Sequence, residues 1–489
     1  MHLKSLLAAA VAVPLIPAAA ETVLGVYIFS RHGDRTAKIL GNDYLTDLGY
    51  EEVFTSGTYF RDQYIANGST SQIYGISPDV VNYQQIAASA PFDNVLTPSA
   101  QGFLQGLYPP VGPTLGSQVL RNGTTVESPM GGFQLIPVQV ISSASGSESQ
   151  IWLQGSTGCA LAEESSNEYF TTSDYFNLLN STADFYQSLS PVINATFAES
   201  AISYFNAYAI FDLVNVALIH NATIPDSDLL TPSAVLQLQT LADHHEFSLA
   251  YNASSPIRAI TGATIGAQIL EALNSTITAK GSKASPLINI QFGAYAGFLS
   301  FFGLAGLTQA NPEFYGLPDY ASTMTFELVT NSSVSTTAYP SVDDISVRFL
   351  WHNHTTSNYS TPTPVPLFGQ DQTLLSWNDF AASMNNFSIG SQEQWCKACG
   401  NTTGVCASTT SSGSPSPSST SNPGSSSSSS SGGISNAVAG VIGAMVTLAV
   451  ILGVEALIML IAGLRLVNKK RIGAGGVAQT GATMDTMKA

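Results

Sequence analysis

The sequence predicts an α/β fold with a mainly parallel sheet and an α-helical insertion. The run from Val23 to Phe29 is rich in β-forming residues on both faces, as in a strand buried within a parallel sheet. A short charged loop and a helix-like segment from Leu45 to Arg61 follow it, and this order of strand, loop and helix is typical of α/β proteins. Several helix-like stretches, such as Glu199 to His220, then follow one another between about residues 165 and 255, which predicts the helical insertion.

Later strands of the same sheet are predicted from two apolar runs, Ile288 to Phe302 and Val347 to Trp351. The segment that contains all of these elements, residues 21 to 406, is long enough for one large domain or for a core with an inserted subdomain. We expect this segment to be the functional part of the chain.

The two ends of the chain do not have the composition of a globular domain. Residues 1 to 20 have a cationic start, an apolar centre and an Ala-rich end, which predicts a cleaved secretory signal peptide. Residues 407 to 436 form a stalk rich in Ser, Thr, Pro and Gly, and residues 437 to 464 are apolar enough to cross a bilayer as a helix. Cations follow directly in residues 465 to 489, so we expect a single-pass type I membrane protein with a cytosolic tail.

The distribution of glycosylation sequons supports an ectodomain in the secretory pathway. Twelve N-x-Ser/Thr sequons all precede the stalk, with Asn at positions 67, 122, 180, 194, 221, 252, 274, 331, 353, 358, 386 and 401. N-glycans are therefore expected partners of this segment. The plasma membrane and a vacuolar-type membrane fit the sequence equally well.

Four cysteines, Cys159, Cys396, Cys399 and Cys406, are an even number in a chain expected to pass through an oxidising compartment. They predict two disulfides, and all three possible connectivities remain open. Cys396 and Cys399 also form a C-x-x-C pair, but no second pair of zinc ligands follows it, so no metal site is expected.

The charge of the chain excludes one class of partner. Of 489 residues only 10% are charged, and the formal net charge is −17 at pH 7. Binding to nucleic acid requires a basic surface that neutralises phosphates, and nothing in this sequence supplies one.

The chemistry is expected directly after the first predicted strand, in the segment SRHGDRT from Ser30 to Thr36. Functional groups in open α/β sheets gather where strands end and loops begin. The flanking Arg31 and Arg35 disfavour the protonated form of His32 and keep its ring neutral and nucleophilic, and their guanidinium groups match the oxygens of a phosphate. Gly33 would let a tetrahedral anion approach the backbone closely.

The scarcity of cations elsewhere strengthens this interpretation. Residues 21 to 433 contain only ten Lys and Arg, and three of them, Arg31, Arg35 and Lys38, fall within eight residues. A covalent route through a phosphohistidine on His32 is therefore plausible. A solvated charged loop that contains a hydrogen-bonded histidine would produce the same pattern, and the residues alone do not separate the two.

Five segments carry the motifs of one family. They are Arg31 to Arg35 (R-H-G-x-R), Leu45 to Gly49 (L-T-x-x-G), a helix from Ser99 to Pro109, a strand from Phe133 to Val138 and a strand from Val347 to Leu350. In these segments the sequence resembles the histidine acid phosphatases, the branch of the phosphoglycerate-mutase-like superfamily that includes fungal phytases. The resemblance implies a phosphoglycerate-mutase-like sandwich and a hydrolase of phosphomonoesters that needs no cofactor.

The resemblance also implies roles for the residues of the first motif. His32 would be the nucleophile, Arg31 and Arg35 would bind the phosphoryl oxygens, and a phosphorylated small molecule or another anion would be the substrate. Asp34, which lies between the arginines, is expected to be ionised and to accept hydrogen bonds near the substrate.

The sequence departs from the family pattern at Ala37, where proline is usual, and at two further places. Ile76 and Asn82, or Val95 in another alignment, stand where the family has a further phosphate-binding arginine. Tyr295 and Ala296 stand where the family has a late His-Asp pair, and Tyr295 offers a hydrogen bond to the substrate in its place.

Another polar cluster, Asp243 to Glu246, resembles the H-D-E-W stretch of fungal phytases, which is not their catalytic pair. We expect this cluster to be a helix start with surface histidines.

Three hypotheses follow for the function. The chain is a membrane-tethered phosphomonoesterase with reduced or altered activity, a catalytically degenerate relative that binds a phosphorylated or anionic ligand, or a glycosylated surface protein.

Overall fold

The computed structural model describes residues 21–141, 158–220, 224, 227–282, 285–335 and 337–407. The predicted signal peptide, almost all of the stalk, the predicted transmembrane segment and the predicted tail lie outside these residues. Among the helices that the structure describes, none combines the length and the apolar character needed to cross a bilayer.

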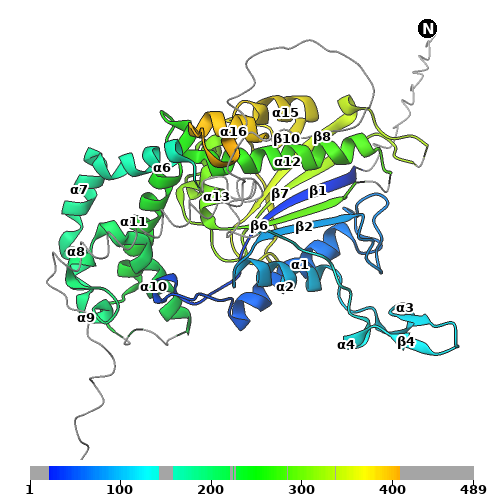
Figure 1. Cartoon of the computed structure of the whole chain (residues 1–489), viewed down its shortest axis with the longest axis horizontal. Helices are drawn as coiled ribbons and strands as arrows, with labels where there is room; N and C mark the ends of the chain where they lie inside the picture. Colours follow the sequence, from blue (N-terminus) through cyan, green and yellow to red (C-terminus); the bar gives the residue numbers. More distant parts are fainter. Residues whose placement is uncertain are drawn as a thin grey trace, which may run out of the picture. The chain divides into compact units, whose positions relative to one another are not determined.

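A central sheet organises the fold and is built around the long strand β1 (Thr22–Arg31). Its strands run in the order β10-β8-β7-β1-β6-β2-β5 (Figure 1). The other strands of this series are β2 (Ile86–Pro91), β5 (Gln139–Ile141), β6 (Ile288–Gly293), β7 (Thr323–Thr330), β8 (Ile345–His352) and β10 (Leu374–Ser376). β1 pairs in parallel with β6, β6 with β2 and β2 with β5, while β7 is antiparallel to both of its neighbours. The predicted α/β fold with a largely parallel sheet is confirmed.

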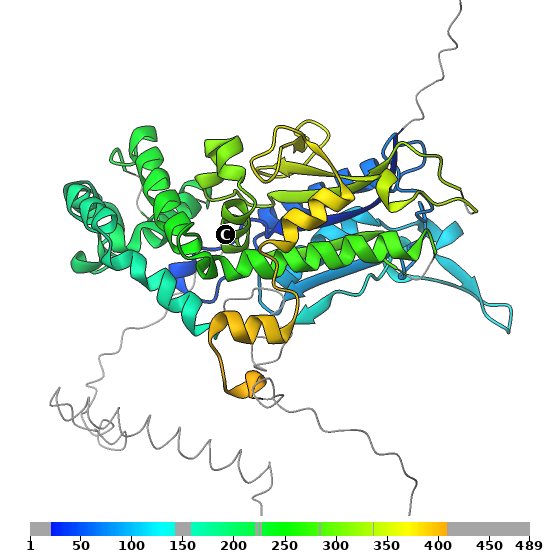
Figure 2. The ribbon, with the colours of Figure 1, turned by 90° about the horizontal axis from the view of Figure 1, so that it is seen from above.

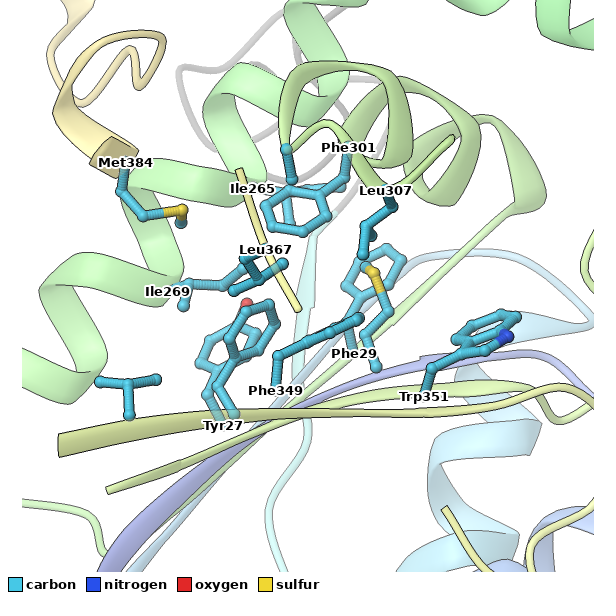
Figure 3. Close-up of a cluster of buried hydrophobic side chains, with 14 of the residues drawn as sticks. Tyr27, Phe29, Ile265, Ile269, Phe301, Leu307, Phe349, Trp351, Leu367 and Met384 are labelled. Carbon is cyan, nitrogen blue, oxygen red and sulfur yellow. The ribbon is translucent and has the colours of Figure 1, made fainter. Parts of the chain in front are cut away.

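Both faces of the sheet are covered by helices, which explains why β1 is apolar on both sides. Tyr27 and Phe29 of β1 belong to one hydrophobic cluster, and Val26 and Ile28 belong to the other. The first cluster joins the sheet to α12 (Ile260–Ala279), α13 (Tyr295–Leu304) and α15 (Trp377–Asn385). The second joins it to α1 (Asp47–Tyr64) and α2 (Leu96–Leu107). Figure 3 shows the first cluster, and Figure 2 shows α12 lying lengthwise over the sheet.

A group of helices with its own hydrophobic cluster is inserted between β5 and β6. It consists of α6 (Ala160–Asn167), α7 (Ser173–Ser181), α8 (Ala183–Ser188), α9 (Ser190–Ile193), α10 (Ala207–His220) and α11 (Pro232–Ala250), and we call it the helical cap. It lies beyond one end of the sheet (Figure 1). The predicted helical insertion is confirmed.

The remaining elements are short. They are α3 (Gly112–Leu115), α4 (Pro129–Gly132), α14 (Leu307–Ala310), α16 (Gln392–Cys399), β3 (Ser117–Val119), β4 (Thr125–Glu127) and β9 (Thr363–Pro364). The 3-10 helices are η1 (Lys38–Leu40), η3 (Glu168–Thr171), η4 (Glu199–Ala201), η5 (Tyr204–Asn206), η6 (Pro256–Ala259), η7 (Pro312–Tyr315), η8 (Val342–Asp344) and η9 (Gly404–Cys406).

The predicted strand from Phe133 to Val138 is wrong, because the strand at this place is β5, which begins only at Gln139. Pro137 has no amide hydrogen and cannot donate to a sheet ladder. The buried Gln134 side chain fixes the segment instead, since it accepts a hydrogen bond from the Val81 amide at 2.7 Å and donates to the carbonyl of Pro109 at 2.9 Å.

The apolar run from Ile288 to Phe302 is predicted to supply a strand, but only its first part forms a strand. β6 ends at Gly293, and Tyr295 begins the helix α13, most of whose residues are buried. A helix that is apolar on all sides shows no period that distinguishes it from a buried strand.

Two disulfides form, as predicted from the four cysteines. Cys159 pairs with Cys399 and so joins the start of the helical cap to α16, while Cys396 pairs with Cys406. The spacing of the cysteines left this connectivity open, because the first bridge joins residues 240 positions apart.

Candidate active site

The predicted motif lies at the C-terminal end of β1, next to the end of β6. Because the two strands are parallel and in register, Arg31 is paired with Gly293, two residues before α13 begins at Tyr295. The Cζ atom of Arg31 lies 5.8 Å from the centre of the Tyr295 ring. The R-H-G-x-R motif therefore meets Tyr295, the position at which the resemblance implies a late His-Asp pair, at one edge of the sheet.

His32 is buried, with 5% of its surface exposed. Its Nδ1 atom lies 2.8 Å from the carbonyl oxygen of Gly33, which can only accept a hydrogen bond, so Nδ1 carries the proton. The lone pair of the neutral ring is then on Nε2, the nitrogen that can act as a nucleophile. The ring centre of Tyr320 lies 5.7 Å from that of His32.

The pKa of His32 is lowered well below its ordinary value. Burial is the largest cause, followed by the charges of Arg31 and Arg35 and more weakly by that of Lys38, while the hydrogen bond to Gly33 opposes them. The imidazole is therefore neutral at mildly acidic pH. This confirms the predicted effect of the flanking arginines and adds burial as the stronger cause.

Gly33 is required by a close contact with α1. A Cβ atom on Gly33 would lie 2.1 Å from the carbonyl oxygen of Gly49, and one on Gly49 would lie 2.1 Å from the carbonyl oxygen of Asp34. The L-T-x-x-G motif is explained at the same time, because the side chain of Thr46 caps α1 by accepting a hydrogen bond from the Gly49 amide at 3.1 Å. The predicted close approach of an anion to Gly33 stays a prediction.

Arg31 is buried, and only some of its hydrogen-bond donors have a partner among the described residues. Its Nη1 group donates to the carbonyl of Pro318, and its Cζ atom lies 4.7 Å from the centre of the Tyr320 ring. Its Nε atom is buried and has no hydrogen-bond partner in the described part of the chain. An unpaired buried donor costs about 1–3 kcal/mol, so Arg31 is suited to bind an anion.

Arg35 is bound to the helical cap. Its Nη2 and Nη1 groups donate to the two carboxylate oxygens of Asp212 on α10 at 2.8 and 3.1 Å. Nη2 also donates to the hydroxyl of Tyr208 at 3.0 Å, and Nη1 to the carbonyl of Thr36 at 2.8 Å. Burial alone would lower the pKa of Arg35, but the nearby Tyr208 and Asp212 raise it, so the guanidinium is firmly charged.

Asp34 is fully buried. One of its oxygens, Oδ2, accepts a hydrogen bond from Thr46 and lies 2.6 Å from Nε2 of His220 at the end of α10. Its amide donates to Glu52 Oε2 at 2.7 Å, and its other carboxylate oxygen, Oδ1, has no partner among the described residues. Burial raises the pKa of Glu52 to about 7, and the charge of Asp34 adds to the rise.

Tyr295 joins the site to α11 of the helical cap. Its hydroxyl donates to Glu246 Oε2 at 2.8 Å, and its ring centre lies 4.7 Å from that of Tyr208. Burial, and then the charge of Glu246, raise the pKa of Tyr295 well above its ordinary value, so the hydroxyl keeps its proton.

The prediction that Asp243 to Glu246 starts a helix with surface histidines is right for His244, whose side chain is exposed, and wrong for the rest. These residues lie inside α11, and His245 is buried, with its Nδ1 atom 2.8 Å from Glu246 Oε1. Their spacing places them on different sides of the helix, so His245 faces the cap interior although its neighbours are polar.

Several residues that shape the site could not be identified from the sequence: Glu52, Tyr208, Asp212, His220 and Tyr320. One signal was present, since Asp212 is the only acidic residue in the apolar segment AYAIFDLVNVALIH of α10. A carboxylate in such a segment is either exposed or paired, and Asp212 is 4% exposed.

Comparison with protein families matches residues 38–352 of this chain to the histidine phosphatase superfamily, branch 2. A comparison with curated proteins gave no match. Among solved structures, the fold is similar to that of Hafnia alvei phytase in complex with tartrate, at 12% identity and a TM-score of 0.51, covering 78% of this chain and 99% of that one. It is also similar to Citrobacter braakii phytase, at 13% identity and a TM-score of 0.50, covering 77% of this chain and 99% of that one. Because the family match spans most of the chain, the protein belongs to the histidine phosphatase superfamily, branch 2.

Proposed function

We propose that this protein hydrolyses phosphomonoesters through a phosphohistidine on His32. The observation that supports this most strongly is the neutral, buried imidazole, whose Nδ1 atom is bound to the Gly33 carbonyl so that Nε2 carries the lone pair. Nε2 attacks the phosphorus, the bond to the ester oxygen breaks with its electron pair on that oxygen, and this oxygen takes a proton from solvent to leave as the alcohol. Water then attacks the phosphohistidine, which releases inorganic phosphate and restores His32.

The phosphoryl oxygens are proposed to bind Arg31. This side chain has a buried Nε–H without a partner and lies at the end of the same strand as His32. Charge-assisted hydrogen bonds from a guanidinium to a phosphate are among the stronger ones in proteins.

Protonation of the leaving group is expected to be slow. Tyr295 can donate a hydrogen bond, but its hydroxyl already donates to Glu246 and its raised pKa makes it a poor acid. General acid catalysis commonly contributes ~10²–10⁴ in rate, so activity is expected to be low for alkyl phosphates. Aryl phosphates, whose leaving groups need less protonation, should react faster.

The proposed substrate is a small phosphomonoester. Among the described residues, the cations whose charges lower the pKa of His32 are Arg31, Arg35 and Lys38, and Arg35 is neutralised by Asp212. A ligand with many phosphate groups needs more cations than this, so we expect a monophosphate to be hydrolysed faster than an inositol hexakisphosphate, although the similar solved structures are phytases.

The test is phosphate release from an aryl phosphate at acidic pH by the purified full-length chain. We expect release by the wild type and none by His32→Ala. His352→Ala is the control, because His352 lies at the end of β8 and contacts the hydroxyl of Ser360. Equal activity of wild type and His32→Ala would refute the proposal.

A second candidate function is binding of a phosphorylated or anionic ligand without turnover. The occupied donors of Arg35 favour it, since they leave the phosphate site with fewer partners. In that case phosphate or vanadate raises the melting temperature, because a ligand that binds only the folded state stabilises it, while no phosphate is released from any ester.

We also propose that the protein is an N-glycosylated, single-pass type I membrane protein of the secretory pathway. The two disulfides support an oxidising compartment. A glycosidase that removes N-glycans should increase the gel mobility of the protein, and the protein should stay in the membrane fraction after alkaline carbonate extraction. Full release by carbonate would contradict the anchor.

A further inference from the structure

We propose that Asp212 of the helical cap competes with the phosphoryl group for Arg35, so that the cap sets the affinity of the site for anions. The inference rests on the proposed function, because it requires a phosphoryl group at His32. It assigns to Asp212 a positioning role that lowers ligand affinity.

The donors of Arg35 can be counted one by one. A guanidinium has five N–H groups, one on Nε and two on each Nη atom. The two on Nη1 are directed to Thr36 and Asp212, and the two on Nη2 are directed to Tyr208 and Asp212. Counting contacts with the described residues, only the Nε–H group is left for a ligand. Arg35 therefore cannot offer a phosphate two parallel hydrogen bonds in this arrangement.

Asp212 is itself fully engaged and buried. Its Oδ1 atom accepts from Arg35, and its Oδ2 atom accepts from Arg35 and, at 2.9 Å, from the amide of Lys38. Its carboxylate has the charge and the two-oxygen geometry that a phosphoryl group would present to the same guanidinium. With 3% and 5% of their side-chain surfaces exposed, the two partners exclude water from this ion pair.

Arg31 provides a contrast within the same motif. Its one hydrogen bond among the described residues is from Nη1 to the Pro318 carbonyl, and its Nε–H is buried without an acceptor. The two arginines of R-H-G-x-R are therefore not equivalent. Arg31 is open to an anion, while Arg35 is occupied by a carboxylate of the protein.

A second contact shows that α10 as a whole holds the motif. Eight residues after Asp212, His220 lies 2.6 Å from Asp34, the neighbour of Arg35. These two contacts are about 12 Å apart along the helix axis at 1.5 Å per residue. A phosphoryl group that takes two hydrogen bonds from Arg35 must therefore displace the Asp212 carboxylate or move α10.

The experiment measures binding of inorganic phosphate and vanadate to the full-length chain by calorimetry, with Asp212→Asn as the main variant. The amide keeps the shape of the side chain but removes the competing charge. We expect the dissociation constant to fall about tenfold or more, because a hydrogen bond between charged partners is gained by the ligand. The melting temperature without ligand should fall, since a buried arginine is left without its counter-ion.

Two further variants keep the result interpretable. Asp184→Asn changes the net charge equally at an exposed position of α8 and should leave the dissociation constant unchanged. Tyr208→Phe frees one N–H of Arg35 but keeps the ion pair with Asp212, so it should tighten binding by a smaller factor. If Asp212→Asn does not fold, Tyr208→Phe alone tests the inference.

Unchanged or weaker binding in folded Asp212→Asn and Tyr208→Phe would overturn the inference, because Asp212 would then orient Arg35 for the ligand instead of competing with it. Absence of binding in every variant would overturn it as well. The proposed function can be refuted independently of this inference. Tighter binding in Asp212→Asn without any phosphohistidine would refute only the proposed phosphatase activity. A phosphohistidine without tighter binding would refute only the competition for Arg35.

Discussion

Substitution of Gly33 by alanine tests how the contact between the loop after β1 and α1 positions His32. The new Cβ atom would lie 2.1 Å from the carbonyl oxygen of Gly49, in the first turn of α1. Both sides of this contact are backbone, so no side chain can rotate away. The loop or the helix must move.

The size of the effect follows from this distance. Real Cβ contacts essentially never fall below 3.0 Å, so the gap must open by at least 0.9 Å, the difference between 3.0 and 2.1 Å. Overpacking of this kind costs about 1–3 kcal/mol of unfolding free energy. A displacement of about 1 Å at a catalytic group costs about 10²-fold in rate. We expect Gly33→Ala to lose both stability and nearly all activity.

The assay compares urea unfolding and aryl phosphate hydrolysis of Gly33→Ala with those of a matched glycine variant. In Gly390→Ala the nearest atom, Cβ of Ala267, would lie at 3.4 Å, an ordinary contact, and this variant should behave as the wild type. Gly33→Ala with wild-type stability and rate would refute the close packing and the role assigned to it.

Three further predictions concern the disulfides and the titrating groups. Loss of the Cys159–Cys399 disulfide, which closes a loop of 240 positions, should lower the unfolding free energy by about 5 kcal/mol. Loss of the Cys396–Cys406 disulfide, which closes a loop of 10 positions, should lower it by about 3 kcal/mol. Equal losses of unfolding free energy in denaturant would contradict this argument from chain entropy. Burial raises the pKa of Glu52 to about 7 in the folded state, so the folded chain binds this proton more tightly than the unfolded chain. The unfolding free energy of the wild type should therefore fall, relative to that of Glu52→Gln, as the pH rises from about 4.5 to 7. A stability difference between these two chains that does not change with pH would oppose that assignment. The pKa of His32 is lowered, so the unfolded chain takes up the proton first as the pH falls below about 6.5, and the wild type should lose stability there relative to His32→Asn. An imidazole NMR signal of His32 that titrates near pH 6.5 would contradict the buried, neutral ring.

Local patterns in the sequence were enough to predict the frame of the site. β1 was recognisable because alternate residues face two different hydrophobic clusters, which makes the strand apolar throughout. The charged motif that follows it was placed correctly because parallel strands end at a common edge. The helical insertion was visible for the same local reason, as a succession of helix-like stretches.

The pairing of charged groups across the site could not be predicted. Arg35 and Asp212 are 177 positions apart, and His220 and Asp34 are 186 apart, so only the packing of the helical cap brings them together. The need for glycine at position 33 could not be predicted either, since it arises from close contact with the backbone of α1. The missed start of α13 has a different cause, because a buried helix and a buried strand share an apolar composition.

Trapping of a covalent intermediate decides whether His32 is the nucleophile. The full-length chain is mixed with an aryl ester of radiolabelled phosphate and quenched within one turnover at alkaline pH, where phosphohistidine survives, and the label is mapped by proteolysis. We predict acid-labile label on the peptide that contains His32 and none in His32→Ala. Phosphate release by the wild type without label on that peptide, or equal release by His32→Ala, would contradict the mechanism.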